Sequence, residues 1–231
     1  MKTKKITILA FCSLLFVNHI FSQSNDSTAF RKDDVNAFDK LIMNPYSKTL
    51  DYTGTAMTGL TLLAPAILFA APTEDYWKIG LEYAETIALA YGVKELCKLC
   101  VNRARPYMYF DGAPENKIED GDWNKSFISG HTTLSFAAAG FTSYLFCKYF
   151  SDSPWKIPVV ISVFSLAAVT AGSRIASGNH FMTDVLCGAL IGTSIGIMVP
   201  YLNSLWIKPT YKSEKLQITG SPMAFAVQVK F

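Results

Sequence analysis

Residues 185–207 read VLCGALIGTSIGIMVPYLNSLWI, and this stretch decides what kind of fold the chain can adopt. The run holds no charged residue and is long enough to cross a bilayer, which takes roughly 20 residues. Two further uncharged runs cover residues 53–71 and 157–172. Apolar runs of this length predict an integral-membrane protein.

The composition agrees with a membrane protein. Half of the residues are hydrophobic, mean hydropathy is +0.23, and 17% are charged, against about 25% in a typical soluble domain. The formal net charge of +3 is small, and no run of Lys and Arg with interleaved aromatic residues is present. We therefore exclude a nucleic-acid partner.

Two more segments are predicted to be membrane helices. Residues 127–150 are apolar apart from His131 near the start and Lys148 near the end. Residues 79–101 carry five charges, which must face other helices or a polar cavity because they would be costly against lipid. The sequence thus predicts an all-α fold, an integral-membrane bundle of about five transmembrane helices spanning residues 52–207.

The two ends of the chain have separate predicted roles. Residues 1–22 resemble a signal peptide, with a basic start, an apolar stretch and the small residue Ser22, although an uncleaved anchor is the alternative. Residues 23–51 form a periplasmic leader, either a short amphipathic helix on the membrane surface or a loosely packed segment. The tail, residues 208–231, has the alternation of a β-hairpin and no assigned function.

The order of the helices sets the topology. With the segment after the signal outside, the loops around residues 98–125 and 173–184 both lie on the outer face. The inner loop and the tail are basic, as the positive-inside rule expects; the lysines concerned are Lys148, Lys156, Lys208, Lys212 and Lys215. The polar motifs of the chain therefore meet at one membrane face, which we predict to be the periplasmic face of a bacterial inner membrane.

One polar motif ends on a histidine and a carboxylate. His180 and Asp184 are four residues apart at the start of the last helix, so they share a face. A carboxylate can hold one ring nitrogen and leave the other free to attack phosphorus. The alternative is a helix-capping aspartate beside an interfacial histidine.

Positively charged residues of the motif segments could bind phosphate beside this pair. Arg174 can bind two phosphate oxygens at once, although a residue reaching to the membrane boundary is the alternative. Lys98 and Arg105 are seven residues apart, two helical turns, and Pro106 is expected to end that helix. Arg103 lies off the same face and ranks lower.

Ser129, Gly130 and His131 begin a helix. Unpaired amides and the helix dipole favour an anion there, Gly130 allows close approach, and His131 can protonate a departing alkoxide. A serine N-cap beside an uninvolved histidine is the alternative. Together, the cations, the nucleophile and the acid meet the needs of phosphoryl transfer, which requires charge placed in advance around the phosphorus.

With its motifs in this order, the sequence resembles the type-2 phosphatidic acid phosphatase superfamily, which includes vanadium haloperoxidases. The family patterns K-x6-R-P, P-S-G-H and S-R-x5-H-x3-D read here as Lys98 to Pro106, Ile128 to His131 and Ser173 to Asp184. Ile128 departs from the family proline and removes no catalytic group. The resemblance covers roughly residues 50–205.

The resemblance implies a role for each site residue. His180 is the nucleophile, Asp184 its partner and His131 the acid for the leaving group. The phosphate ligands implied are Lys98, Arg105, Ser129, Gly130 and Arg174. No metal or other cofactor is expected, and the acidic residues of the loop at 111–122 are expected to be solvated.

The function predicted first is a metal-independent phosphatase that acts on a lipid phosphate, such as lipid A, phosphatidylglycerol phosphate or undecaprenyl diphosphate. The alternatives are a soluble periplasmic acid phosphatase, a vanadate-dependent haloperoxidase, and a binding or transport protein. The predicted partners are the lipid substrate and the bilayer. Gly188, Gly192 and Gly196 recur every fourth position, which favours packing inside the bundle over a homodimer face.

Overall fold

The computed structural model describes residues 30–71, 75–206, 216–220 and 225–229. The predicted signal peptide, residues 1–22, lies outside the described residues. The α-helices are α1 Ala37–Lys40, α2 Lys48–Leu62, α3 Tyr76–Cys100, α4 Glu115–Glu119, α5 Gly130–Tyr149, α6 Lys156–Ala176 and α7 Met182–Trp206. The remaining elements are the 3-10 helices η1 Lys32–Asp34, η2 Ala64–Ala70 and η4 Pro106–Tyr109, and the strands β1 Leu216–Gly220 and β2 Phe225–Val229.

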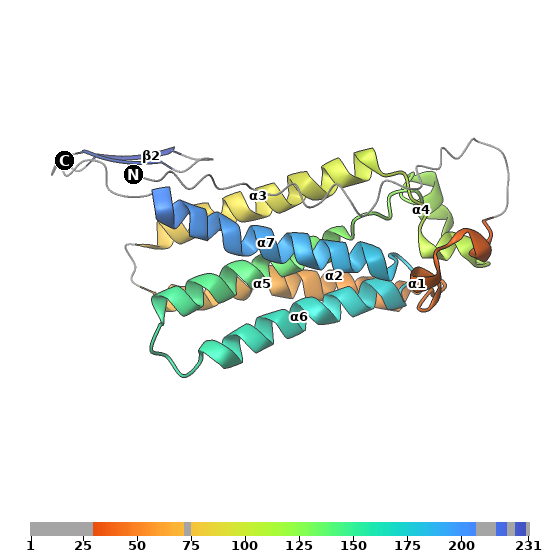
Figure 1. Ribbon diagram of the computed structural model, residues 1–231, viewed down its shortest axis with the longest axis horizontal. Helices are drawn as coiled ribbons and strands as arrows, with labels where there is room; N and C mark the ends of the chain where they lie inside the picture. The colour runs from red at the N-terminus through yellow and green to blue at the C-terminus, as the bar shows by residue number, and fades with distance from the viewer. Residues whose placement is uncertain (1–29, 72–74, 207–215, 221–224, 230–231) are drawn as a thin grey trace, which may run out of the picture.

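Helix α5 forms the centre of the bundle. It packs against α2, α3, α6 and α7, and Figure 1 shows these helices running alongside one another on the long axis of the molecule. Its middle, residues 137–140, is Ala-Ala-Ala-Gly and is buried throughout. Small side chains here let the surrounding helices approach closely, so α5 contacts protein on all sides.

The glycines of α7 face α5. A Cβ atom added at Gly192 would lie 2.2 Å from the backbone oxygen of Thr133, and one at Gly196 would lie 2.2 Å from that of Ala137. Gly188 has a similar approach to the Ser129 oxygen at 2.9 Å. The glycine stripe thus packs inside the bundle, as its spacing favoured.

Within the described residues, three helical segments are long and apolar enough to cross a membrane: Lys48–Ala70, Lys156–Ala176 and Met182–Leu205. The first of these was predicted at residues 53–71 and is made of α2 followed by η2, with Pro65 at the start of η2. The other two predicted spans are present as α3 and α5, but neither is among the segments that meet the combined limits of length, hydropathy and charge. Helix α5 is largely buried by its neighbours, so its composition reflects protein contacts as well as lipid, whereas α3 keeps exposed residues such as Leu96 and Leu99.

The charges of α3 point into the bundle. Glu82, Glu85 and Lys94 are all buried, and Glu85 accepts a hydrogen bond of 2.7 Å from the side-chain amide of Asn203 on α7. The prediction that these charges avoid lipid is confirmed for these three residues. Burial of this kind explains how a charged helix fits an apolar bundle.

The leader is packed on the bundle, which differs from the expectation of a loosely packed segment. Its helix, α1, has only four residues, and the described part of the leader packs on the loops at one end of the bundle. Ser47 donates a backbone hydrogen bond of 3.2 Å to Ser177, and Asn44 donates one of 3.3 Å to the Ile175 oxygen. Polar contacts to these loops, rather than an amphipathic face, hold the leader in place.

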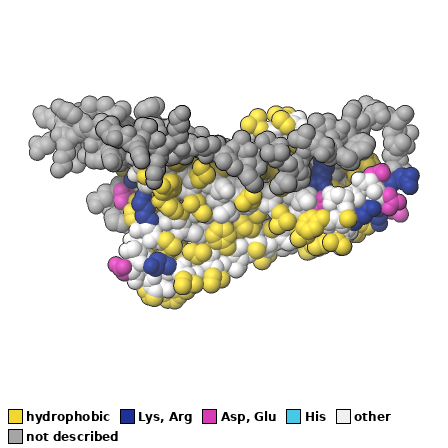
Figure 2. All heavy atoms as spheres, in the orientation of Figure 1, with side chains coloured by type: hydrophobic (Ala, Val, Ile, Leu, Met, Phe, Trp, Pro, Cys, Tyr) yellow, Lys and Arg dark blue, Asp and Glu magenta, His cyan; other side chains and the backbone are white. Residues whose placement is uncertain are grey.

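Charged side chains collect toward the two ends of the molecule, with hydrophobic side chains between them along the visible flank (Figure 2). At one end lie α1, α4 and the loops that carry the polar motifs (Figure 1). In the tail, β1 and β2 pair in antiparallel fashion, with Leu216 opposite Val229. The loop end with α1 and α4 is the part of the fold that positions the site.

Candidate active site

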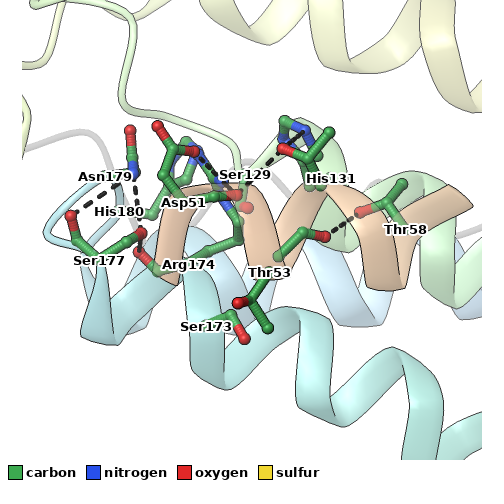
Figure 3. Close-up of polar contacts among 12 residues, drawn as sticks. Asp51, Thr53, Thr58, Ser129, His131, Ser173, Arg174, Ser177, Asn179 and His180 are labelled. Carbon is green, nitrogen blue, oxygen red and sulfur yellow. Dashed lines mark hydrogen bonds and ion pairs between the residues drawn. The ribbon is translucent and has the colours of Figure 1, made fainter. Parts of the chain in front are cut away.

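The predicted site residues meet at the loop end of the bundle. Lys98 lies near the end of α3, His131 in the first turn of α5, Arg174 in the last turn of α6, and His180 in the loop before α7. Asp51, His131, Arg174 and His180 lie together where α2, α5 and α6 approach one another (Figure 3). The site is therefore assembled from segments far apart in the sequence.

The imidazole of His180 is held by hydrogen bonds on both ring nitrogens. Its Nδ1 lies 2.8 Å from the backbone oxygen of Ser126. Because a carbonyl oxygen only accepts, Nδ1 must carry the proton, which leaves Nε2 with its lone pair. Nε2 accepts from Arg105 Nη1 at 3.2 Å. The basic nitrogen of His180 thus faces the cations of the pocket.

His180 is neutral at ordinary pH for a physical reason. Its side chain is fully enclosed, and this burial lowers its pKa well below the usual value. The positive charges of Arg105, Arg174 and Lys98 lower the pKa further, as does His131. That all four groups act on His180 shows that they share one electrostatic environment. A neutral imidazole among cations is suited to act as a nucleophile.

Asp184 is placed differently from the sequence expectation. Its Oδ2 is 3.9 Å from His180 Nδ1, too far for a hydrogen bond, and the Ser126 carbonyl takes that position. Helix α7 begins only at Met182, so the helical geometry assumed for positions 180 and 184 does not apply. Asp184 instead accepts from the Ser126 hydroxyl at 2.6 Å and from the Phe181 amide at 2.9 Å. It holds the segments around the imidazole.

Arg105 is fixed by its surroundings. Helix α3 ends at Cys100, well before Pro106, so Arg105 lies in extended backbone and not on the helical face predicted. Its guanidinium donates to the Asp122 carboxylate at 2.6 Å, to the Asp122 carbonyl at 2.8 Å and to the Asn179 carbonyl at 3.0 Å. These bonds aim Nη1 at His180.

The acidic residues of the loop at 111–122 were expected to be solvated, and Asp122 differs from this expectation. Asp111, Glu115, Glu119 and Asp120 are exposed, as expected, whereas Asp122 is only partly exposed. Burial would raise the pKa of Asp122, but the Arg105 guanidinium outweighs burial and holds it below its usual value. Asp122 is thus a charged anchor for a predicted phosphate ligand.

Arg174 has a carboxylate partner that the sequence did not indicate. Its Nη1 forms an ion pair with Asp51 of α2, whose other oxygen accepts from Lys117 Nζ at 2.6 Å and from the Tyr46 hydroxyl at 2.9 Å. The Arg174 Nε atom is buried and has no hydrogen-bond partner among the described residues. An unused buried donor beside His180 is suited to an anion that enters the pocket.

The start of α5 supplies the remaining predicted residues. Ser129 is fully buried, its amide donates to the Asp184 carbonyl at 3.2 Å, and its hydroxyl lies 2.9 Å from that of Thr132. A Cβ at Gly130 would lie 2.8 Å from the Lys94 side chain, so a larger residue there would displace that lysine. His131 Nε2 is 3.3 Å from the Thr55 hydroxyl.

Lys98 differs from the other cations. Its ammonium is partly exposed and makes no hydrogen bond or ion pair with the part of the chain that the structure describes. It is therefore free to meet a ligand. Within the same described ranges, no three His, Cys, Asp or Glu side chains are grouped to hold a metal ion.

Two residues of this site, Asp51 and Lys117, could not be identified from the sequence alone. Asp51 gives no signal beyond its place before an apolar run, and Lys117 lies in a loop dominated by acidic residues. Arg103 was ranked low, yet it forms ion pairs with Asp184 and with Asp39 of the leader. All three are recognised only through partners distant in the sequence.

Comparison with known proteins supports the resemblance. Lipid A 1-phosphatase of Porphyromonas gingivalis is 30% identical over 145 residues, which is 62% of this chain and 28% of that protein. Lipid phosphate phosphatase 1 of Arabidopsis thaliana is 30% identical over 137 residues, 51% of this chain and 41% of that protein. The chain thus spans well under two thirds of these relatives.

The fold also matches a solved structure. The crystal structure of Aquifex aeolicus LpxE has a TM-score of 0.50 at 23% identity, and the match covers 74% of this chain and 99% of that chain. The family model described as the PAP2 superfamily matches residues 79–208, which include all three polar motifs. By this match, the chain belongs to the PAP2 superfamily.

Proposed function

We propose that this protein is a membrane phosphatase that hydrolyses a lipid phosphate through a phosphohistidine intermediate on His180. One observation carries the proposal: the lone-pair nitrogen of His180 lies 3.2 Å from Arg105 Nη1, and the positive charges of Arg105, Arg174 and Lys98 all act on its ring. A phosphoryl group bound among these cations would have its phosphorus within reach of Nε2.

The reaction has two steps. His180 Nε2 forms a bond to phosphorus while the bond from phosphorus to the lipid oxygen breaks, and His131 gives its proton to the departing oxygen. Water then attacks the phosphohistidine, passes a proton to His131, and inorganic phosphate leaves. Lys98, Arg105 and Arg174 bind the phosphoryl oxygens, assisted by Ser129 and Gly130 at the start of α5. No step needs a metal ion.

A lipid substrate follows from where the site lies. The pocket is at the end of a bundle with three helices suited to cross a membrane, so a phosphate at the headgroup level would reach it. The named relatives include a lipid A 1-phosphatase and a lipid phosphate phosphatase. Candidates for this chain are lipid A, phosphatidylglycerol phosphate and undecaprenyl diphosphate.

For the membrane arrangement, we propose that α3 and α5 cross the bilayer together with the three apolar segments. A cleaved signal at residues 1–22 would then place the leader and the site on the periplasmic face of a bacterial inner membrane. The phosphatase domain would cover residues 52–207, preceded by the leader 23–51 and followed by the tail 208–231. The basic inner loop and tail support this orientation.

Phosphate release from a panel of purified lipid phosphates tests the function. The protein is assayed in detergent micelles against the three candidate lipids and a soluble aryl phosphate, without added metal and with EDTA. We expect release from at least one lipid, together with an acid-labile phosphoenzyme that the His180→Ala variant lacks. Phosphate release from none of the lipids would contradict the proposal, and bromide oxidation with added vanadate would favour a haloperoxidase.

A further inference from the structure

The leader places a buried carboxylate against the loop end of the bundle. Asp39 of α1 is 1% exposed and its side chain has several partners. Its Oδ1 accepts from the Thr183 amide at 2.9 Å, and its Oδ2 accepts from the Thr183 hydroxyl at 2.7 Å and from Asn36 Nδ2 at 2.7 Å. A carboxylate this enclosed is retained only where its charge is compensated.

Arg103 provides that compensation and links Asp39 to the site. Its Nη2 donates to Asp39 Oδ2 at 2.6 Å, and its Nη1 donates to the Thr183 hydroxyl at 2.8 Å and forms an ion pair with Asp184. The guanidinium also stacks 4.2 Å from the centre of the Phe181 ring. Arg103 is therefore fixed between two fully buried carboxylates, one from the leader and one from α7.

The chain of contacts continues to the catalytic imidazole. Asp184 Oδ2 accepts from the Ser126 hydroxyl at 2.6 Å, and the Ser126 carbonyl accepts from His180 Nδ1 at 2.8 Å. A continuous path of hydrogen bonds and ion pairs therefore joins Asp39 to the ring. Groups that orient a functional imidazole in this way set both its tautomer and its direction.

We propose that Asp39 is a positioning residue for His180, acting through Arg103, Asp184 and Ser126, so that the leader completes the active site. The inference rests on the proposed role of His180 as nucleophile. Without the leader carboxylate, Arg103 keeps Asp184 as its one anionic partner and can shift toward it. Ser126 and the His180 ring that it binds through Nδ1 would then move with Asp184. Nε2 would no longer point toward the phosphoryl group.

The test compares Asp39→Asn with Asp33→Asn in full-length protein. Asp33 is a matched control because it lies in the same leader and its side chain is 80% exposed. We expect Asp39→Asn to lower kcat about 10- to 100-fold on a lipid phosphate with KM changed less than about twofold, the scale of outer-shell effects on activity. Asp33→Asn should match the wild type.

A second readout follows the imidazole itself. In ¹⁵N-histidine-labelled protein, the His180 Nδ1–H signal should shift or broaden in Asp39→Asn and in Arg103→Lys, and stay unchanged in Asp33→Asn. A purely structural role for Asp39 predicts a lower melting temperature with unchanged kcat per folded molecule and an unchanged His180 signal, and that result would overturn the inference. If Asp39→Asn fails to fold, Arg103→Lys provides the same comparison.

Failure of the inference can be told apart from failure of the proposed function. If the wild type releases phosphate and Asp39→Asn keeps full kcat, only the positioning role is wrong. If the wild type is inactive on every lipid, the proposed function fails, and the His180 signal in Asp39→Asn still decides whether the network reaches the ring. A double variant with Asp184→Asn should lose little beyond the single Asp184→Asn change, because both act on one path; full additivity would contradict that path.

Discussion

At the scale of residues, the chemistry depends on which nitrogen of His180 carries its proton. The Ser126 carbonyl keeps the proton on Nδ1, and Nε2 remains basic beside Arg105. His180→Ala should therefore abolish turnover, by roughly 10⁴-fold or more as for removal of other covalent nucleophiles. Phosphate release and phosphoenzyme trapping measure the loss, with a melting curve to verify folding. Retained turnover would rule out His180 as nucleophile.

The loss of kcat caused by removing the His131 side chain is expected to grow as the leaving group becomes poorer. An alkyl phosphate needs a proton on its departing oxygen, whereas an aryl phosphate leaves as a stable phenolate. His131→Ala should thus slow alkyl phosphates by about 10²- to 10⁴-fold, the range of general acid catalysis, and aryl phosphates much less. Paired kcat values on both substrate types test this expectation; equal losses would exclude an acid role.

The lowered pKa of His180 predicts the direction in which stability changes with pH. Burial, with the nearby cations, lowers this pKa well below the usual value, so folded His180 stays neutral at the pH, near 6.5, where the unfolded chain takes up a proton. Acidification below about pH 6.5 therefore favours the unfolded state, and stability returns as pH rises. The ¹⁵N resonances of His180 should remain those of a neutral ring as the pH falls through 6.5; protonation near pH 6.5 would contradict the burial argument.

At the scale of elements, the close packing of α7 against α5 positions the first turn of α5, which carries His131. Gly192→Ala would bring a Cβ within 2.2 Å of the backbone oxygen of Thr133, which lies two residues after His131 in α5. Since backbone has to move, we expect a loss of about 1–3 kcal/mol of stability or more, with reduced activity. Gly172→Ala on α6 is the control, because a Cβ there meets nothing within 4 Å. Thermal unfolding of both variants in detergent gives the comparison.

At the scale of the whole molecule, three helical segments within the described residues are long and apolar enough to cross a bilayer, and charged side chains lie toward the two ends, so we predict that a bilayer surrounds the bundle. The native protein should stay in the membrane pellet after an alkaline wash and enter solution only with detergent. A peripheral protein, released by the same wash, serves as the control. Release of this chain would contradict membrane integration and favour the soluble acid phosphatase.

Much of the fold can be read from the apolar runs, because long uncharged segments have few options outside a bilayer. The helices beginning near residues 48, 156 and 182 follow from composition alone. The hydropathy of α5 is a weaker guide, since this helix is surrounded by protein and its small residues reflect packing. The leader was predicted poorly because its attachment depends on Asp39 and Asn44, whose partners lie in distant loops.

The three polar motifs, in their linear order, indicated the family and the candidate site residues, and the order of the apolar segments predicted that these residues meet at one end of the bundle. Only the tertiary structure decided how those groups are connected. The Ser126 carbonyl, and not Asp184, binds the imidazole of His180. Asp51 pairs with Arg174, and Arg103 lies between the carboxylates of Asp39 and Asp184. The reason is physical. Spacing along a chain predicts contacts only within a regular helix, whereas these bonds form between loops and helix ends whose separation is set by packing.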